Sequence, residues 1–266
     1  MRALGAAAIV TLGLPSAAGA ADFGGGTPAD VGLTLVSVRT ADDGSARVGA
    51  KVAAGCGVGT ATRAVQLAAD GTFAFSATVR RGAGDGVRQT TRIALSGQVA
   101  GASASGTVTA RLTFRRGARV VERCSATRTW SARAAAAETA PGPPVAGGAY
   151  YGLTNQTAPV VLRVDPAATR VRTAAFEYVQ RCRREPFEWE NITPGAPIAG
   201  DGTFRLRERF SIRWKEGRER YRVKVDGRFT TTGVSGTLSV SSVLRAPGGR
   251  VVDRCRTGRT TFAAVL

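Results

Sequence analysis

The sequence predicts an all-β protein of two tandem antiparallel domains, each a β-sandwich or flattened barrel of about seven or eight strands. The first observation is a duplication, because residues 117–124 and 70–73 recur as residues 248–255 and 201–204, both 131 positions later. The second is the alternation of apolar and polar residues with period two, which is typical of strands that bury one face. Turn signals about every 8 to 12 residues complete the pattern.

The chain of 266 residues divides into four segments. Its start has the form of a secretory signal peptide, with Arg2 before an apolar stretch and Ala18 and Ala20 at a small-residue cleavage site. An uncleaved anchor is the alternative, but the apolar stretch is shorter than the roughly 20 residues that a spanning helix prefers. A Pro/Ala/Gly linker near the middle is expected to hold the domains apart. The segments are residues 1–20 (signal peptide), 23–134 (first repeat), 135–147 (linker) and 148–266 (second repeat).

Each repeat is expected to begin with the same three strands. The first, residues 23–27 or 150–154, is placed at a sheet edge, and the next apolar run forms the second. The third alternates cleanly up to a cysteine, which puts Cys56 or Cys182 on the same face as the apolar residues. A variable loop is expected after this cysteine.

The later strands of each repeat follow from turns. An Asp-Gly turn starts the strand at Phe73 or Phe204, and the next strand carries Gly97 or Gly227 in its middle. Because glycine is unfavourable in mid-strand, we expect a backbone or an aromatic ring to approach too closely there for a Cβ atom. Short Gly-rich turns then join the strand Val-Val-Glu/Asp-Arg-Cys to its neighbour in a meander, and a last run carries Trp130 inward.

Four cysteines, two in each repeat, agree with export. Three pairings are open, and the duplication favours one bridge within each repeat, Cys56 with Cys124 and Cys182 with Cys255. Loops of about 70 residues give about 4 kcal/mol of stabilisation per bridge in the chain-entropy model. A metal site built from all four cysteines is disfavoured, because the chain lacks Cys-x-x-Cys spacing and contains no histidine.

Several short motifs of the second repeat occur together in a known context. They are Tyr-Tyr-Gly-x-Thr-x-Gln at 150–156, a mid-domain cysteine, Asp-Gly-Thr-Phe at 201–204, Gly-x-Phe at 227–229, Gly-Thr-Leu at 236–238 and Val-Asp-Arg-Cys-Arg-Thr-Gly at 252–258. This pattern resembles an uncharacterised family of secreted β-domains from high-GC bacteria. The resemblance implies a fold and a compartment, and it implies no activity and no cofactor. The first repeat departs from it with glycines at 24–26 and Ser-Ala-Thr after Cys124.

Few residues suggest catalysis, and a non-enzyme without cofactor or metal is predicted. The absence of histidine excludes Ser-His-Asp and Cys-His constellations. Glu188 and Glu190 would lie about 6.5 to 7 Å apart on one strand face, within reach of glycosidase separations, although a solvated strand face is the simpler interpretation. The matched acids Glu122 and Asp253 are expected to pair with nearby arginines.

The formal charge of +18 favours polyanionic partners, although a basic composition also serves general solubility. Along residues 204–214 and 220–228 the apolar side chains alternate with cations, so a hairpin turning at residues 215–217 would place eight cations on one face. Asp226 is its main interruption. We expect this basic ladder to bind anionic cell-wall polymers or acidic polysaccharide, without sequence-specific binding of nucleic acid. The ladder consists of Arg205, Arg207, Arg209, Arg213, Arg220, Arg222, Lys224 and Arg228.

The sequence therefore predicts a secreted or cell-envelope β-module without enzymatic activity. A carbohydrate-active hydrolase that uses Glu188 and Glu190 is one alternative, and a purely structural repeat is another. A lipocalin-like carrier would require a hollow barrel, which the many core aromatics disfavour.

Overall fold

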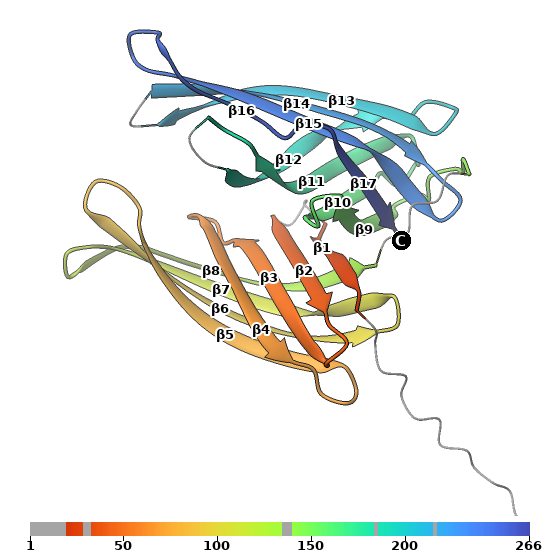
Figure 1. Cartoon of the computed structure of the whole chain (residues 1–266), viewed down its shortest axis with the longest axis horizontal. Coiled ribbons are helices and arrows are strands. Elements are labelled where there is room, and N and C mark those ends of the chain that lie inside the picture. The colour runs from red at the N-terminus through yellow and green to blue at the C-terminus, as the bar shows by residue number, and fades with distance from the viewer. Residues whose placement is uncertain (1–19, 29–32, 135–139, 184–185, 215–216) are drawn as a thin grey trace, which may run out of the picture.

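The protein is described by a computed structural model that covers residues 20–28, 33–134, 140–183, 186–214 and 217–266. The predicted signal peptide lies outside the described residues except for Ala20. Within these ranges no helix is long and apolar enough to cross a membrane. Both halves of the described chain are built from antiparallel strands (Figure 1), which confirms the predicted all-β class.

The first domain is one antiparallel sheet of eight strands that curls until it is nearly closed. Its strand order is β4-β3-β2-β1-β8-β7-β6-β5, so the chain starts in the middle of the sheet and reaches the two edges at β4 and β5. The strands are β1 (Asp22–Thr27), β2 (Thr34–Thr40), β3 (Ser45–Ala53), β4 (Val58–Gln66), β5 (Thr72–Gly82), β6 (Val87–Ala100), β7 (Ser103–Arg116) and β8 (Arg119–Arg133).

The second domain repeats this sheet with one change. Its order is β12-β11-β10-β9-β17-β15-β14-β13, and β16 pairs with β15 beside that path. The single long β8 is replaced by β16 and β17, which a break at Thr257 and Gly258 separates. The strands are β9 (Ala149–Thr154), β10 (Pro159–Val164), β11 (Arg170–Gln180), β12 (Phe187–Pro197), β13 (Thr203–Trp214), β14 (Gly217–Phe229), β15 (Gly233–Arg245), β16 (Val251–Arg256) and β17 (Thr260–Val265).

Two sequence-based expectations about the strands are wrong. The first strand of each repeat is not at an edge, because β1 lies between β2 and β8, and β9 lies between β10 and β17. The expected variable loop after each mid-domain cysteine contains a strand, β4 or β12. In β4 the apolar side chains alternate only in its first half, up to Ala61, and Val65 is half-buried. This is too short a run for the period-two signal to stand out.

Both domain interiors are filled by side chains. In the first, Phe73 packs near Trp130 with ring centroids 6.3 Å apart, within a cluster that draws on all eight strands. In the second, Phe176 meets Phe262 edge to face at 5.4 Å, and Tyr178 is fully buried. This packing disagrees with the hollow barrel that a lipocalin-like carrier requires.

One disulfide closes each repeat, as the duplication predicted. Cys56 is bonded to Cys124 across 68 residues, and Cys182 is bonded to Cys255 across 73 residues. Each bridge ties the chain that follows the third strand of its repeat to β8 or to β16. In the second repeat the backbones of Arg181 and Arg256 also exchange two hydrogen bonds there.

The two domains pack against each other, contrary to the expectation that the linker holds them apart. An apolar cluster crosses the boundary and joins Leu33 and Leu35 to Val161 and Ala175. The described linker residues 140–147 lie on the second domain, where Pro141 forms a β-bridge with Thr230. Figure 1 shows β1 and β2 directly below β9 and β10.

Candidate functional site

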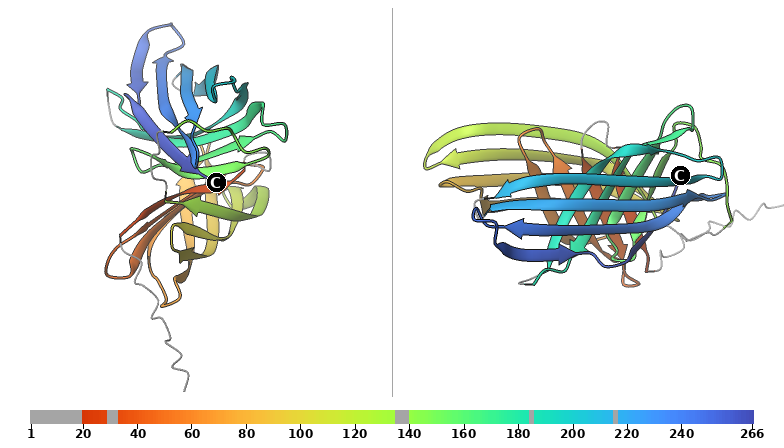
Figure 2. Two further views of the ribbon diagram at one scale, coloured as in Figure 1. Left: turned by 90° about the vertical axis from the view of Figure 1, so that its right-hand side faces the viewer. Right: turned by 90° about the horizontal axis from the view of Figure 1, so that it is seen from above.

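All eight cations of the predicted basic ladder are exposed and lie on the outer face of β13 and β14. The two strands form the predicted hairpin, in which Arg207 is opposite Lys224 and Arg209 is opposite Arg222. Figure 2, in its view from above, looks onto this outer face, where β13 to β16 run side by side. The geometry of the ladder is therefore as predicted.

The ladder is divided by its acidic neighbours into two unequal parts. Asp226 accepts a 2.6 Å hydrogen bond from Arg207 and lies 3.8 Å from Arg205. Asp201 lies 3.5 Å from Arg228. Three of the eight cations are therefore partly neutralised, all toward one end of the hairpin, and the positive charge is concentrated at the other end.

At that other end the outer surface is hollowed. The hollow has a volume of about 550 Å³ and lies over β13, β14 and β15. Among the described residues that line it there is no Asp or Glu, whereas Ser211 and Ser241 contribute hydroxyl groups. We call it the second arginine hollow. Its arginines are Arg209, Arg218, Arg220, Arg222 and Arg245.

The first domain has a hollow in the corresponding place, which the sequence reasoning missed. It has a volume of about 930 Å³ and again no acidic residue among the described residues that line it. We call it the first arginine hollow. Its arginines are Arg80, Arg81, Arg88, Arg92, Arg111, Arg115 and Arg123.

Strand register relates the two hollows position by position. Arg88 is opposite Arg115 in the first domain, and Arg218 is opposite Arg245 in the second, each 130 residues later. Arg92 and Arg222 correspond in the same way, as do Arg123 and Arg254 on the neighbouring strand. The signal was present in the sequence as arginines at a constant offset. It was missed because only the strand beginning at Phe73 was compared with the ladder.

A further match concerns how one arginine is held. Arg115 donates from Nη1 to the carbonyl oxygen of Ala118 at 3.1 Å, and Arg245 donates from Nη1 to the carbonyl oxygen of Gly249 at 2.8 Å. Both carbonyls belong to the tight turn that follows the strand. The same guanidinium group is therefore fixed by the same kind of contact in both domains.

The predicted carboxylate pair does not form a catalytic site among the described residues. Glu190 is opposite Glu177 on β11, and Lys51 of the first domain binds both, at 3.3 Å and 3.1 Å. Burial opposes the charge of Lys51, but the two carboxylates outweigh it and raise the pKa of the ammonium group. Glu190 therefore belongs to an ion-pair network between the domains. The side chain of Glu188 lies outside the described residues.

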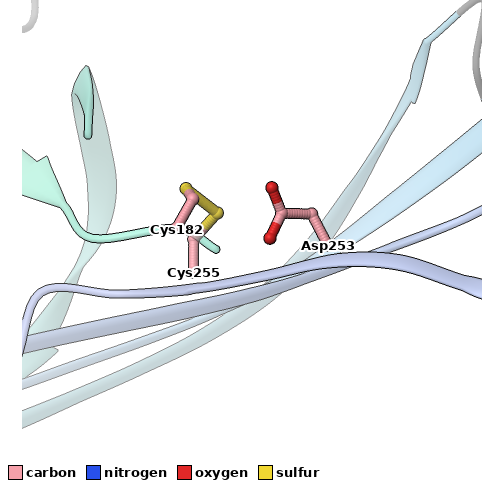
Figure 3. A group of neighbouring side chains, drawn as sticks. All are labelled: Cys182, Asp253 and Cys255. Carbon is pink, nitrogen blue, oxygen red and sulfur yellow. A yellow bond between two sulfur atoms is a disulfide. The ribbon is translucent and has the colours of Figure 1, made fainter. Parts of the chain in front are cut away.

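The acid before the second disulfide also has a structural role. Figure 3 shows the Asp253 carboxylate beside the Cys182–Cys255 bond. It accepts hydrogen bonds from the amides of Arg183 at 3.0 Å and Arg254 at 2.7 Å. Because both sulfur atoms are committed to the disulfide, these three residues do not offer a metal its thiolate ligands. Asp253 thus binds backbone amides, where a pair with an arginine side chain was expected.

A buried carboxylate inside the second domain was not anticipated. Glu219 accepts hydrogen bonds from Trp214 Nε1 at 2.8 Å, from the Tyr221 hydroxyl at 2.7 Å and from the Ser242 hydroxyl at 2.6 Å. Burial, and then the hydrogen bond to Glu219, raises the pKa of the Tyr221 hydroxyl. The first domain has Gln89 and Thr91 at the positions of Glu219 and Tyr221, so this cluster belongs to one repeat only.

Comparisons with known proteins add no assignment. No protein-family model matches the chain, and no curated protein matches it. A solved structure of an AofleA mutant from Arthrobotrys oligospora, with three arginines changed to alanine, aligns with 91% of this chain and 84% of that chain. Its identity is 11% and its TM-score 0.17, which is too low to indicate a shared fold. The function is therefore argued from the residues of this chain.

Proposed function

We propose that the protein is an exported, non-enzymatic β-module that binds anionic polymers at the cell envelope or outside the cell, through the two arginine hollows. Its disulfides suit an oxidising compartment, and the N-terminal residues have the composition of a secretory signal. Binding of a polymer, as opposed to a small molecule, agrees with two open surfaces that carry the same charge.

One observation carries the proposal. Like charges directly opposite each other on neighbouring strands destabilise a sheet, yet Arg88 faces Arg115 and Arg218 faces Arg245 at the same place in both repeats. Neither pair has an acidic residue among the described residues that line its hollow. Retention of this cost in both copies is what an anion-binding surface requires, because the ligand supplies the missing negative charge.

The test compares two variants of the full chain that remove the same charge from the same sheet. In the first, Arg209, Arg220 and Arg222 of the second hollow are changed to threonine. In the second, the partly neutralised Arg205, Arg207 and Arg228 are changed to threonine. Elution from a heparin column and the salt dependence of binding are measured, with melting temperature as a control for folding.

We expect the first variant to elute at clearly lower salt and to show a weaker salt dependence, since each lost contact releases fewer counterions. The second variant should elute close to the unmodified protein. Adding Arg92, Arg111 and Arg123 changes to the first variant should remove most of the remaining retention. Equal losses in the two matched variants would reduce binding to net charge, and no loss in any variant would leave a purely structural repeat.

A further inference from the structure

The two arginine hollows concentrate more positive charge than a surface for scattered anions needs. Opposed side chains on neighbouring strands have Cβ atoms about 4.5 to 5.5 Å apart, and successive residues on one strand face are about 6.5 to 7 Å apart. Arg218, Arg220 and Arg222 follow one another on β14, with Arg245 opposite the first and Arg209 opposite the last. Five guanidinium groups therefore converge on one hollow.

The donors of the second hollow are partly organised before any ligand arrives. Arg218 donates from Nε and Nη2 to Ser211 Oγ at 3.0 and 2.7 Å. Because this oxygen accepts both bonds, its own proton is directed elsewhere and can be donated to a ligand. Arg245 is fixed by its bond to the turn carbonyl of Gly249. The hollow thus offers planar guanidinium forks and hydroxyl donors together.

We propose that each arginine hollow is a phosphate-binding site, and that the anionic polymer carries closely spaced phosphate groups. This proposal rests on the function proposed above and specifies its ligand. A phosphomonoester supplies up to two negative charges and three strong acceptor oxygens on one tetrahedral centre, and adjacent phosphates in a chain supply comparable density. A polysaccharide with one carboxylate per sugar spreads its charge too widely to neutralise five converging cations. Arginine forks also bind phosphate bidentately.

The same chemistry argues for a phosphate chain without bases. Aromatic rings that stack on bases are the usual means of binding single-stranded nucleic acid. The aromatic residues that border the second hollow, Phe210 and Tyr221, are stacked on each other with centroids 4.8 Å apart. They lie on the apolar side of β13 and β14, away from the ladder. In the first hollow the residues between the arginines are Thr90, Thr113 and glycines.

The experiment measures binding of the full chain to three polymers matched in number of charges: inorganic polyphosphate, polyglutamate and single-stranded DNA. A charge-preserving variant carries Arg→Lys changes at Arg88, Arg92, Arg115, Arg218, Arg222 and Arg245. Lysine keeps the charge but loses the planar fork. We expect polyphosphate to bind the unmodified protein about tenfold more tightly than polyglutamate, and the lysine variant to lose about tenfold toward polyphosphate alone.

Equal binding of polyphosphate and polyglutamate, or a lysine variant that binds polyphosphate as well as the unmodified protein, would overturn the phosphate assignment. Both outcomes would leave the polymer-binding function intact, because that function depends on the threonine variants described above. Tighter binding of DNA than of polyphosphate would overturn the assignment to a chain without bases. Melting curves of the lysine variant show whether its fold is preserved.

Discussion

At the scale of single residues, the mid-strand glycines behave as the sequence indicated. A Cβ atom on Gly227 would lie 2.3 Å from the tip of the Phe204 ring, and one on Gly97 would lie 2.5 Å from the Trp130 ring. Both glycines are therefore occupied by an aromatic side chain of the same domain. This was predictable because the strand pattern exposed an unfavourable residue at an apolar position.

Changing Gly227 to valine should lower the melting temperature by several degrees. Overpacking of a filled core costs about 1 to 3 kcal/mol, and each kcal/mol corresponds to about 2 to 4 °C in a chain of this size. The matched control is Gly82→Val, since Gly82 also lies in a strand but has open space where its Cβ would be. A melting curve for the Gly227 variant that coincides with that of the control would contradict the steric explanation.

At the scale of elements, the strands with long alternation were predictable and the others were not. The sequence placed β3, β6 and their counterparts, because each alternates over many residues. It missed β4, where exposure of the second half removes the alternation. It also treated the last two runs of each repeat alike, whereas β8 is continuous and its counterpart breaks at Gly258, which has a φ of 72°. The Arg-Thr-Gly sequence of the second repeat explains this difference.

The two disulfides should contribute similarly to stability, because they close loops of similar length. We expect a Cys182→Ser, Cys255→Ser variant and a Cys56→Ser, Cys124→Ser variant each to lose about 4 kcal/mol in the chain-entropy model. The free energy of unfolding in urea measures this loss. A loss below about 1 kcal/mol for either bridge would show that the sheet alone restrains that part of the chain.

The candidate site was predictable only in part, and the reason again concerns elements. Alternation showed that the ladder cations share a face, but their acidic partners could not be assigned. Asp201 lies in a turn before β13, and only the paired register brings it close to Arg228. The hollows depend on residues from β14, β15 and the turns that follow, so their position required the three-dimensional register.

At the scale of the whole molecule, the contact between domains could not be foreseen from composition. Lys51, Glu177 and Glu190 come from strands that are distant in sequence, and their side chains are only 10 to 18% exposed. Changing Lys51 to methionine leaves two opposed carboxylates at this boundary. We expect a loss of about 2 kcal/mol, smaller than for a fully buried pair. Thermal melting should show it, with Lys224→Met as an exposed control that leaves the melting temperature nearly unchanged.

The contribution of Lys51 should also depend on pH. Its folded pKa is raised, so the stabilisation is fully present below the unfolded pKa of about 10.4 and is lost as the pH rises through the folded value. The difference in melting temperature between the unmodified protein and the Lys51→Met variant should therefore be constant from about pH 7 to 9 and shrink at more alkaline pH. A difference that vanishes near neutral pH would contradict the ion-pair role.

The glycines of β1 have a consequence for how the two repeats can be combined. A Cβ on Gly24 would lie 2.1 Å from the carbonyl oxygen of Gly152 in the other domain, so this position admits no side chain. The second repeat has Tyr151 at the equivalent position. A chimeric chain made of two second repeats would therefore be unable to form the same contact. The duplicated copies have become non-interchangeable halves of a closed pair, and a third repeat could not be added by repeating their junction.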